Sequence, residues 1–528
     1  MNWNLINNAA ILAIDKNALD TKNKLALYWV GENNEEKQYT FGEILSLANQ
    51  FANFLKDLKV RKGDRVFFFL PRIPLIYYGF LGAIKTGAIA GTLFPAFGTQ
   101  ALYDRLKNSE AKFIIIDPNL YLRLKPILPK LSKLKNIIIT NDEFSKKLSQ
   151  YPVTFKNIKM KPNDPAFMLY TSATGNTPVS GITIPHQAIV QQIKSAKYFF
   201  HFKKGDRYWC TADPGWVTGV VYGILAPWGC GVTQLVYGGR FSADIWLKFL
   251  NKYRINIFYT APTALRMIQK DSLHKKYFFP DLRLIASVGE ALPPDLFSWT
   301  KKYFHLPVQD TYWQTETGSM MIANFPGLLI KSGSMGKPLP GINAAIVDEH
   351  GQTLGLKQIG NLVFKPPWPS MMVKIWKNST LFQSYFKNGW FITGDQAYKD
   401  KDGYYWFVGR KSEIIKTAGE RVGTFEVESV LNQHLSVLES AVIGKPDALR
   451  GEIIKAFIIL KDKQIPSDNL KLNIQSFMKT HLAGHAYPRE IEFVKKLPKN
   501  RSGKIMRRLL KANELGKPLG DISTLEES

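Results

Sequence analysis

The chain is poor in cysteine, in acidic residues and in long apolar runs, and each shortage excludes a class of protein. Its 528 residues contain only two cysteines, Cys210 and Cys230, which excludes a disulfide framework and a cysteine-rich metal site. The apolar stretch 220–232 is broken by Pro227 and by glycines and is too short to span a membrane. Residues 1–30 lack the basic segment of a secretory signal. We therefore expect a soluble, cytoplasmic protein in a reducing compartment.

The shortage of acidic residues leaves the chain strongly basic. There are 43 Asp and Glu against 70 Lys and Arg, a formal net charge of +27. Such a balance suits nucleic acid, an anionic membrane surface or phosphorylated small molecules. The densest basic segment contains Lys495, Lys496, Lys499, Arg501, Lys504, Arg507 and Arg508. A run of like charges is usually only a solvated surface, and no nucleic-acid-binding motif is present, so we expect neither nucleic acid nor a membrane as partner.

The remaining composition is that of a globular protein, with 45% hydrophobic and 21% charged residues. The length predicts roughly two to four domains. Thr40 and Glu43 form a capping box, and apolar residues recur after it at helical spacing as far as Leu58. Expected helices (75–85, 99–109, 185–196, 243–252) alternate with apolar runs (66–70, 88–94, 113–117, 233–237, 257–260). This alternation predicts layered α/β sheets with buried parallel strands.

The pattern changes twice toward the C-terminus. Residues 340–410 contain short β-like runs separated by glycine-containing turns, which indicates a small β-rich unit. From about residue 411 a compact α+β pattern follows, with helices expected at 427–433 and 469–480 and strands at 439–443 and 456–460. We place the domain boundary at 410–412. The predicted fold class is α/β: a large N-terminal domain (1–410) of layered α/β subdomains plus a β-rich subdomain, and a small α+β C-terminal domain (411–528).

A hydroxyl- and glycine-rich loop follows the strand predicted at 166–170. It reads Thr171-Ser-Ala-Thr-Gly-Asn-Thr-Pro-Val-Ser-Gly181, and a helix is expected to begin near Pro185. A loop of this kind between a strand and a helix presents backbone N–H groups and hydroxyls to a phosphate. An ordinary surface turn is the alternative reading of this segment.

A second polar segment, 310–318, reads Asp-Thr-Tyr-Trp-Gln-Thr-Glu-Thr-Gly and follows the strand-like run 306–309. A carboxylate beside hydroxyls at the end of a strand can hold Mg²⁺ together with a phosphate oxygen. A polar loop with core aromatic residues is the alternative.

Two more segments carry charge at expected turns. Gly394-Asp395 is followed fifteen residues later by Gly409-Arg410; an aspartate can accept from two ribose hydroxyls, and an arginine can reach a hydroxyl or a phosphate. The segment 498–504, Pro-Lys-Asn-Arg-Ser-Gly-Lys, carries Lys504 at the tip of a turn. A lysine placed there can enter a phosphate site as a point charge.

These four elements, in this order and spacing, resemble the adenylate-forming superfamily of acyl-CoA synthetases, luciferases and nonribosomal peptide adenylation domains. Within that superfamily the chain is most similar to AMP-forming acetyl-CoA synthetases. The segments that carry the narrower resemblance are 211–219 (Thr-Ala-Asp-Pro-Gly-Trp-Val-Thr-Gly), 287–290 (Ser-Val-Gly-Glu), 419–423 (Gly-Glu-Arg-Val-Gly) and 501–504 (Arg-Ser-Gly-Lys). The resemblance covers roughly residues 30–510, and agreement of several motifs is far less expected by chance than one match.

The resemblance implies a ligase that joins acetate to AMP with release of pyrophosphate and then transfers the acetyl group to CoA. Mg²⁺ would be the cofactor, and ATP, acetate and CoA the substrates. Lys504, Thr315 and Glu316 would be catalytic, with Glu316 also associated with Mg²⁺. The ATP- and AMP-binding residues would be Thr171, Ser172, Thr174, Thr177, Gly289, Glu290, Asp310, Thr311, Gln314, Asp395, Arg410 and Arg421.

The resemblance also implies an acyl pocket, a tunnel for CoA and a hinge. The acyl pocket would be lined by Val217, Thr218, Val288 and Trp313. Gly419 would line the CoA tunnel, and a mobile C-terminal domain would rotate about Ser412 between the two half-reactions. Lys504 is in addition a candidate target for a lysine-modifying enzyme.

Two positions depart from the pattern of the superfamily. The phosphate loop usually reads Thr-Ser-Gly-Thr-Thr-Gly followed by Pro-Lys-Gly, whereas here Ala173 replaces the first glycine, one residue is missing near Gly175, and Val179-Ser180 replaces Lys-Gly. The hinge residue, usually Asp or Lys, is Ser412. The altered loop leaves open a degenerate, non-catalytic relative or a polyanion-binding protein, and the acid could be propionate or another short acid. We expect an active acetate ligase, because the loop keeps its hydroxyl and backbone N–H donors.

Overall fold

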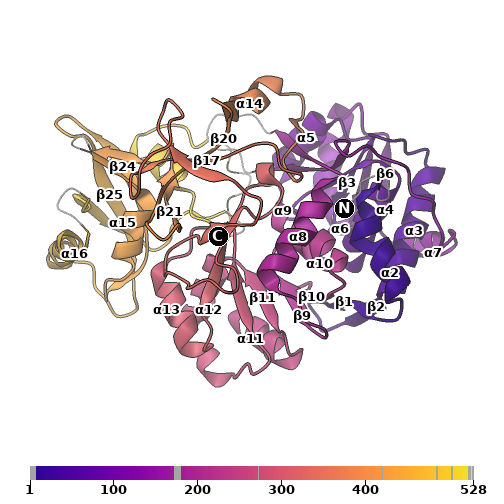
Figure 1. Cartoon of the computed structure of the whole chain (residues 1–528), viewed down its shortest axis with the longest axis horizontal. Helices are drawn as coiled ribbons and strands as arrows, with labels where there is room; N and C mark the ends of the chain where they lie inside the picture. Colours follow the sequence, from indigo (N-terminus) through magenta and orange to yellow (C-terminus); the bar gives the residue numbers. More distant parts are fainter. Residues whose placement is uncertain are drawn as a thin grey trace.

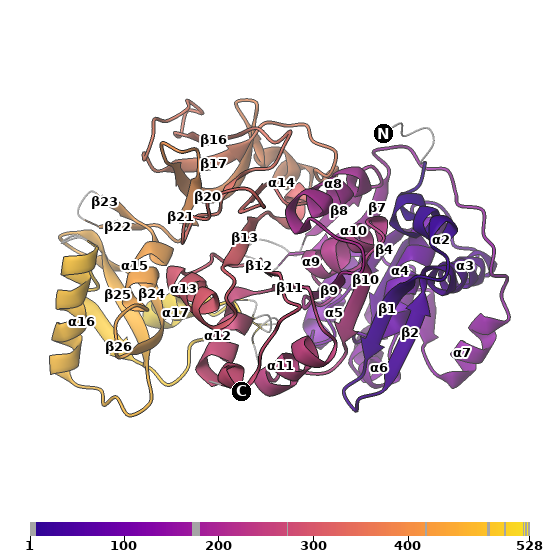
Figure 2. The same ribbon diagram turned by 60° about the horizontal axis from the view of Figure 1, so that its bottom comes forward.

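The structure is a computed structural model that describes residues 7–171, 180–271, 273–417, 420–482, 486–500, 503–520, 522 and 525. Within these residues the strands form four sheets. Both views place the C-terminal sheet at one end of the molecule and the N-terminal helices at the other (Figures 1 and 2). The chain therefore keeps its early and late segments apart, with the middle segments between them.

A seven-stranded sheet lies toward the N-terminal end, in the order β18-β8-β7-β4-β3-β5-β6. Its strands are β3 (Arg65–Phe69), β4 (Ile89–Thr92), β5 (Phe113–Ile116), β6 (Asn136–Ile139), β7 (Pro165–Tyr170), β8 (Gly181–Pro185) and β18 (Lys374–Ile375). The helical segments before and between them are α3 (Phe41–Asp57), α4 (Pro74–Lys85), α5 (Thr99–Ser109), α6 (Pro118–Leu124), η2 (Lys125–Lys130) and α7 (Asp142–Ser149). The strands from β7 to β6 are parallel, whereas β8 and β18 are antiparallel to their neighbours.

A nine-stranded sheet follows, in the order β15-β14-β13-β12-β11-β9-β10-β1-β2. Its strands are β1 (Leu25–Val30), β2 (Glu36–Thr40), β9 (Arg207–Cys210), β10 (Thr233–Tyr237), β11 (Ile257–Thr260), β12 (Leu284–Ser287), β13 (Val308–Tyr312), β14 (Ile322–Ala323) and β15 (Lys337–Pro338). The helical segments of this part are η1 (Ile11–Asp15), α2 (Lys16–Asp20), α8 (Ala188–Phe200), α9 (Val217–Val220), η3 (Val221–Leu225), α10 (Ala226–Gly229), α11 (Ala243–Lys252), α12 (Pro262–Asp271), η4 (Leu273–Lys276), α13 (Pro294–Tyr303) and η5 (Thr315–Thr317).

Two smaller sheets complete the chain. The first has the order β16-β17-β20-β19, with β21 paired to β20; its elements are β16 (Ala344–Val347), β17 (Gly360–Phe364), α14 (Ser379–Ser384), β19 (Phe386–Lys387), β20 (Trp390–Lys399) and β21 (Tyr405–Arg410). The second has the order β23-β22-β25-β24, with β26 paired to β25. Its elements are β22 (Ile415–Thr417), β23 (Glu420–Val422), α15 (Thr424–Leu431), β24 (Val437–Asp447), β25 (Gly451–Leu460), α16 (Asp468–His481), β26 (Glu490–Phe493) and α17 (Arg507–Glu514).

The two large sheets share one hydrophobic core. Phe68 on β3 and Val236 on β10 belong to the same buried cluster, to which α4, α8 and α10 contribute Phe80, Phe199 and Trp228. A separate cluster consists entirely of residues between Ile415 and Ile491. The first core joins the seven-stranded and nine-stranded sheets into a single packed body. The C-terminal sheet is packed around a separate set of apolar side chains.

The predicted fold class is confirmed: layered α/β sheets, a small antiparallel β unit and a compact α+β unit follow one another as expected. The capping box is present, since Glu43 N donates to Thr40 Oγ1 at 3.2 Å and Thr40 N donates to the Glu43 carboxylate at 2.7 Å. None of the described helices has the length and apolar character needed to cross a bilayer.

The helix predicted at 185–196 is present, but it begins three residues later than expected, and a strand that was not predicted precedes it. Residues 181–185 form β8, antiparallel to β7, and α8 begins at Ala188. The strand is buried along its whole length and contains three consecutive β-branched residues, which favour a strand inside a sheet. The loop after Thr171 therefore connects two antiparallel strands and does not lead into a helix. The strand predicted at 306–309 is also displaced: β13 spans Val308–Tyr312 and includes Asp310 and Thr311.

A buried ion pair joins the N-terminal segment to the seven-stranded sheet. Lys85, at the end of α4, is 1% exposed and its ammonium lies 2.5 Å from Asp15 Oδ1. Asn157 bridges the pair, accepting from Lys85 Nζ at 3.2 Å and donating to Asp15 Oδ2 at 2.6 Å. Burial lowers the pKa of Lys85. The carboxylate therefore compensates a cation that has little access to water.

We expect Asp15→Ala to lower the free energy of unfolding by about 3 kcal/mol, because it leaves the Lys85 ammonium buried without its counter-charge. Urea unfolding followed by tryptophan fluorescence measures the loss. The double variant Asp15→Ala/Lys85→Met serves as control and should regain most of it, since no unpaired charge is then buried. Equal stability of Asp15→Ala and the wild type would contradict this role of the pair.

Candidate active site

A cavity of about 1460 Å³ lies where the nine-stranded sheet, the β-rich unit and the C-terminal segment meet. Its wall includes the following predicted residues: Thr171, Val217, Thr218, Val288, Gly289, Glu290, Trp313, Gln314, Thr315, Glu316, Asp395, Arg410, Ser412 and Lys504. Asp310 and Thr311 line an adjoining hollow that shares Glu290, Asp395 and Lys504 with it. Ser172, Thr174, Thr177 and Gly419 lie outside the described residues, as does the side chain of Arg421, and their roles stay predictions.

Parallel strands explain why segments distant in sequence meet here. In β11, β12 and β13 the register pairs Thr260 with Ser287, and Ser287 with Asp310. The chain leaves each strand at the same edge of the sheet, so 261–263, 288–290 and 313–316 emerge side by side. Loops beyond the carboxyl ends of parallel strands are the usual place for ligands in α/β folds.

Asp395 and Arg410 lie opposite each other on neighbouring strands of the β-rich unit. They are register partners on β20 and β21, and Arg410 Nε lies 3.8 Å from Asp395 Oδ1. The other carboxylate oxygen, Oδ2, accepts from Tyr312 Oη at 2.6 Å and from Gln314 Nε2 at 2.8 Å. The carboxylate is therefore held in place through one oxygen, and its second oxygen is directed toward Arg410.

Glu316 is a buried carboxylate in η5. Tyr385 Oη donates to its Oε1 at 3.0 Å, and burial raises the pKa of its carboxyl. No cluster of three His, Cys, Asp or Glu ligands occurs in the described part of the chain. Mg²⁺ commonly takes one or two carboxylates together with substrate phosphates and water. Glu316 alone thus suits a Mg²⁺ ion that arrives with a nucleotide.

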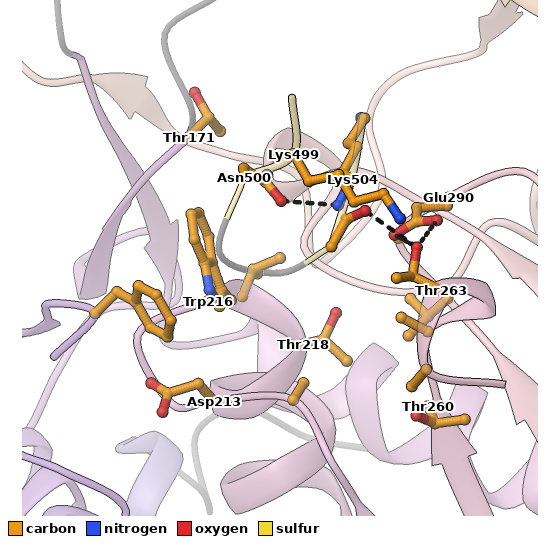
Figure 3. Close-up of a pocket in the computed structure, with 18 of the residues that line it drawn as sticks. Thr171, Asp213, Trp216, Thr218, Thr260, Thr263, Glu290, Lys499, Asn500 and Lys504 are labelled. Carbon is orange, nitrogen blue, oxygen red and sulfur yellow. Dashed lines mark hydrogen bonds between the residues drawn. The ribbon is translucent and has the colours of Figure 1, made fainter. Parts of the chain in front are cut away.

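Lys504 stands on a tight turn that the backbone closes. Asn500 N donates to Lys504 O at 2.8 Å, and Lys504 N donates to Asn500 Oδ1 at 2.9 Å. Gly503 occupies the left-handed region, with φ +89°, where a side chain would be strained. Figure 3 shows the side chain of Lys504 reaching toward Glu290. The positive charge of Arg410, together with burial, lowers the pKa of Lys504 to about 8.

The expected acyl pocket is built around an aromatic pair. The rings of Trp313 and Tyr222 meet edge to face, with centroids 5.1 Å apart. Tyr222 Oη is fixed by Ser195 Oγ at 2.7 Å and by Met320 N, which donates to it at 2.8 Å. The ring of Trp313 therefore packs against Tyr222, whose hydroxyl is held by two hydrogen bonds.

Sequence reasoning missed three residues that contact the predicted ones: Tyr312, Tyr385 and Thr263. Tyr312 lies two residues before Gln314, and the period of a strand would have placed both side chains on one face. Tyr385 reaches Glu316 across 69 residues, and Thr263 reaches Gly503 across 240. No local sequence pattern predicts contacts between residues so far apart in the chain.

Two models of known protein families match the chain along most of its length. Residues 14–376 match the family model of AMP-binding enzymes, and residues 426–504 match that of the AMP-binding enzyme C-terminal domain. The chain belongs to the AMP-binding enzyme family.

Two curated relatives of this AMP-binding enzyme carry the name acetyl-coenzyme A synthetase. The protein of Bacillus subtilis (strain 168) is 49% identical over 98% of this chain and 93% of its own. The protein of Methanothrix thermoacetophila is 38% identical over 98% of this chain and 84% of its own. Among solved structures, the anthranilate CoA ligase AuaEII in complex with anthranoyl-AMP is 30% identical, with a TM-score of 0.88 over 97% of both chains.

The buried carboxyl of Asp310 should make the stability of the protein depend on pH. It is 5% exposed, its Oδ1 has no hydrogen-bond partner among the described residues, and burial raises its pKa to about 7. The folded enzyme thus favours the protonated carboxyl. The stability that this preference contributes is present at low pH and is lost as the pH rises through about 7.

We expect Asp310→Asn, which is neutral at every pH, to remove that dependence. Between about pH 5 and pH 7 the free energy of unfolding of the wild type should fall relative to the variant by up to about 1.4 kcal/mol per pH unit. Urea unfolding of both proteins across this range measures the difference. Parallel pH profiles would show that Asp310 is ionised in the folded enzyme throughout.

Proposed function

We propose that this AMP-binding enzyme is an AMP-forming acetate:CoA ligase. The observation that carries the proposal is the meeting of Lys504 with Asp395, Arg410 and Trp313 around one cavity. It is supported by relatives named acetyl-coenzyme A synthetase that match nearly the whole chain. ATP, acetate and CoA are its substrates, and Mg²⁺ is its cofactor.

The reaction has two half-reactions. In the first, an acetate oxygen attacks the α-phosphorus of ATP, the bond from that phosphorus to pyrophosphate breaks, and acetyl-AMP forms. In the second, the CoA thiol loses its proton and attacks the acetyl carbonyl carbon, and AMP leaves as acetyl-CoA forms. A carboxylate is a poor acyl donor because it would have to expel oxide. Joining it to AMP supplies a better leaving group.

The residues of the cavity suit the charge changes of the first step. Lys504 brings an ammonium into the cavity, Thr315 presents a hydroxyl, and Asp395 and Arg410 would bind the ribose. Glu316 would hold Mg²⁺, which would neutralise phosphate charge. Electrostatic stabilisation of this kind contributes several kcal/mol in comparable sites.

We also propose the domain boundary at 410–412, between a large domain (1–410) and a small one (411–528). In support, β21 ends at Arg410, the hydrophobic cluster of the C-terminal sheet begins at Ile415, and Ser412 lies on the cavity wall between them. Rotation about this segment would withdraw Lys504 and bring Gly419 to the cavity for the thiol step.

A lysine-modifying enzyme is a further partner that we propose, and its target is Lys504. Acylation of Lys504 by a lysine-modifying enzyme would remove the charge that adenylation uses and would stop the first half-reaction. A cytoplasmic location is supported by the two cysteines, both of which are free thiols.

Acetate-dependent exchange between pyrophosphate and ATP tests the proposed function directly. A panel of short acids should give the fastest exchange with acetate. A protein that binds ATP but exchanges with none of the acids would be the non-catalytic relative that the altered phosphate loop left open. Faster exchange with propionate than with acetate would assign the protein to the longer acid.

We expect Lys504→Ala to abolish formation of acetyl-AMP while sparing the formation of acetyl-CoA from supplied acetyl-AMP. The reason is that the lysine would be withdrawn from the cavity in the second step. Lys401→Ala, which removes an exposed lysine from a turn outside the cavity, is the matched control and should keep both rates. Equal loss of both half-reactions in Lys504→Ala would refute the division.

We expect Trp313→Gly to shift the preference from acetate toward longer acids. In the wild type, each added methylene would press against the indole at a cost of about 1–3 kcal/mol. The ratio of kcat/KM for butyrate to that for acetate measures the effect. Phe278→Gly, at a 68% exposed aromatic residue outside the cavity wall, is the control. An unchanged chain-length profile would make Trp313 a core residue only.

A further inference from the structure

Thr263 lies between the two parts of the chain that form the cavity. It stands in the first turn of α12, just beyond the carboxyl end of β11. Its hydroxyl oxygen is 2.9 and 2.7 Å from the two carboxylate oxygens of Glu290 and 3.2 Å from the carbonyl oxygen of Gly503. Figure 3 shows the side chains of Thr263 and Glu290 together, with Lys504 beside them.

The contact with Gly503 is close as well as polar. A Cβ added to Gly503 would lie 2.3 Å from Thr263 Cγ2 and 2.9 Å from Thr263 Cβ, so the turn packs directly against this side chain. Lys504 follows Gly503 in the chain, and Asn500 fixes its backbone. Fixing the Gly503 carbonyl therefore fixes the point from which the lysine side chain starts.

The turn is attached to its own domain by other contacts. Lys499 Nζ lies 2.8 Å from Glu439 Oε1, with both side chains largely buried, and Met506 N donates to Pro498 O at 2.8 Å. Lys499 and Ile505 also form a β-bridge. These contacts join residues of the C-terminal segment only, and they move with it. The Thr263–Gly503 hydrogen bond, in contrast, crosses to the large domain and must break when the small domain rotates.

We propose that Thr263 is a positioning residue for the first half-reaction: its hydroxyl holds the Gly503 carbonyl and thereby seats Lys504 in the cavity. This proposal rests on the proposed function. The same hydroxyl is shared with Glu290, because one proton faces three acceptor oxygens. A nucleotide group that donates to Glu290 releases that proton for Gly503, which links occupancy of the nucleotide site to seating of the lysine.

The test compares side chains that differ by one hydroxyl. Thr263→Val keeps the shape of threonine without the hydroxyl, and Thr263→Ser and Thr263→Ala form a second matched pair. We expect Thr263→Val and Thr263→Ala to lower kcat for acetyl-AMP formation about tenfold, the loss of one hydrogen bond. Thr263→Ser should remain close to the wild type. With acetyl-AMP at saturating concentration, the rate of acetyl-CoA formation should fall much less than the rate of adenylation in Thr263→Val and Thr263→Ala.

The thiol half-reaction also reports folding, because a damaged core would slow both steps. Equal losses in the two half-reactions, or adenylation rates that do not separate Ser from Ala, would overturn the role of Thr263. A rise in KM for ATP with kcat unchanged would do so too, since Thr263 would then act through Glu290 alone. Failure of the wild type to exchange with any acid would instead refute the proposed function, so the two failures are distinguishable.

Discussion

The site depends on two positive charges, Lys504 and Arg410, that share one cavity. Their mutual repulsion, together with burial, lowers the pKa of Lys504 to about 8, while the nearby carboxylates of Glu413, Glu290 and Asp395 act in the opposite direction. Like charges at such positions destabilise each other unless an anion lies between them. A triphosphate supplies that anion. The arrangement is therefore least favourable when empty and improves when the nucleotide enters.

The two charges stand on different parts of the fold. Arg410 belongs to a β-sheet and is held opposite Asp395 by strand register. Lys504 belongs to a C-terminal segment with its own hydrophobic cluster. Thr263 donates a hydrogen bond to the carbonyl of Gly503, the residue before Lys504. One cation thus stands on a β-sheet and the other on a segment with a hydrophobic cluster of its own, and our proposal is that this segment moves between the two half-reactions.

Much of this could be predicted from sequence because the signals are local. The run 66–70 identifies a buried parallel strand without knowledge of its neighbours, and the Thr40–Glu43 capping box is contained within four residues. The segment 181–185 was not recognised as a strand, and the helix at 188–200 was expected to begin near Pro185. Its strand character comes from pairing with β7 and β18, which only the tertiary fold supplies.

The candidate site divides in the same way. Asp395, Arg410 and Lys504 stand in short motifs, so they could be named in advance, and the structure brings them to one cavity. Tyr385 and Thr263 have no motif, and they matter through single hydrogen bonds to Glu316 and Gly503, which lie far away in sequence. Supporting contacts of this kind follow from packing and cannot be read from a local pattern.

The most direct test of this account is the pKa of Lys504 with and without nucleotide. The free enzyme is treated with a small acylating reagent that reacts with amines, at a series of pH values. The extent of acylation of the peptide that contains Lys504, measured by mass spectrometry, gives that pKa. We expect a value near 8 in the free enzyme and a clear rise when Mg²⁺ and a non-hydrolysable ATP analogue are bound, because phosphate charge favours the ammonium. A value near that of an ordinary lysine in the free enzyme, or no change on nucleotide binding, would contradict it.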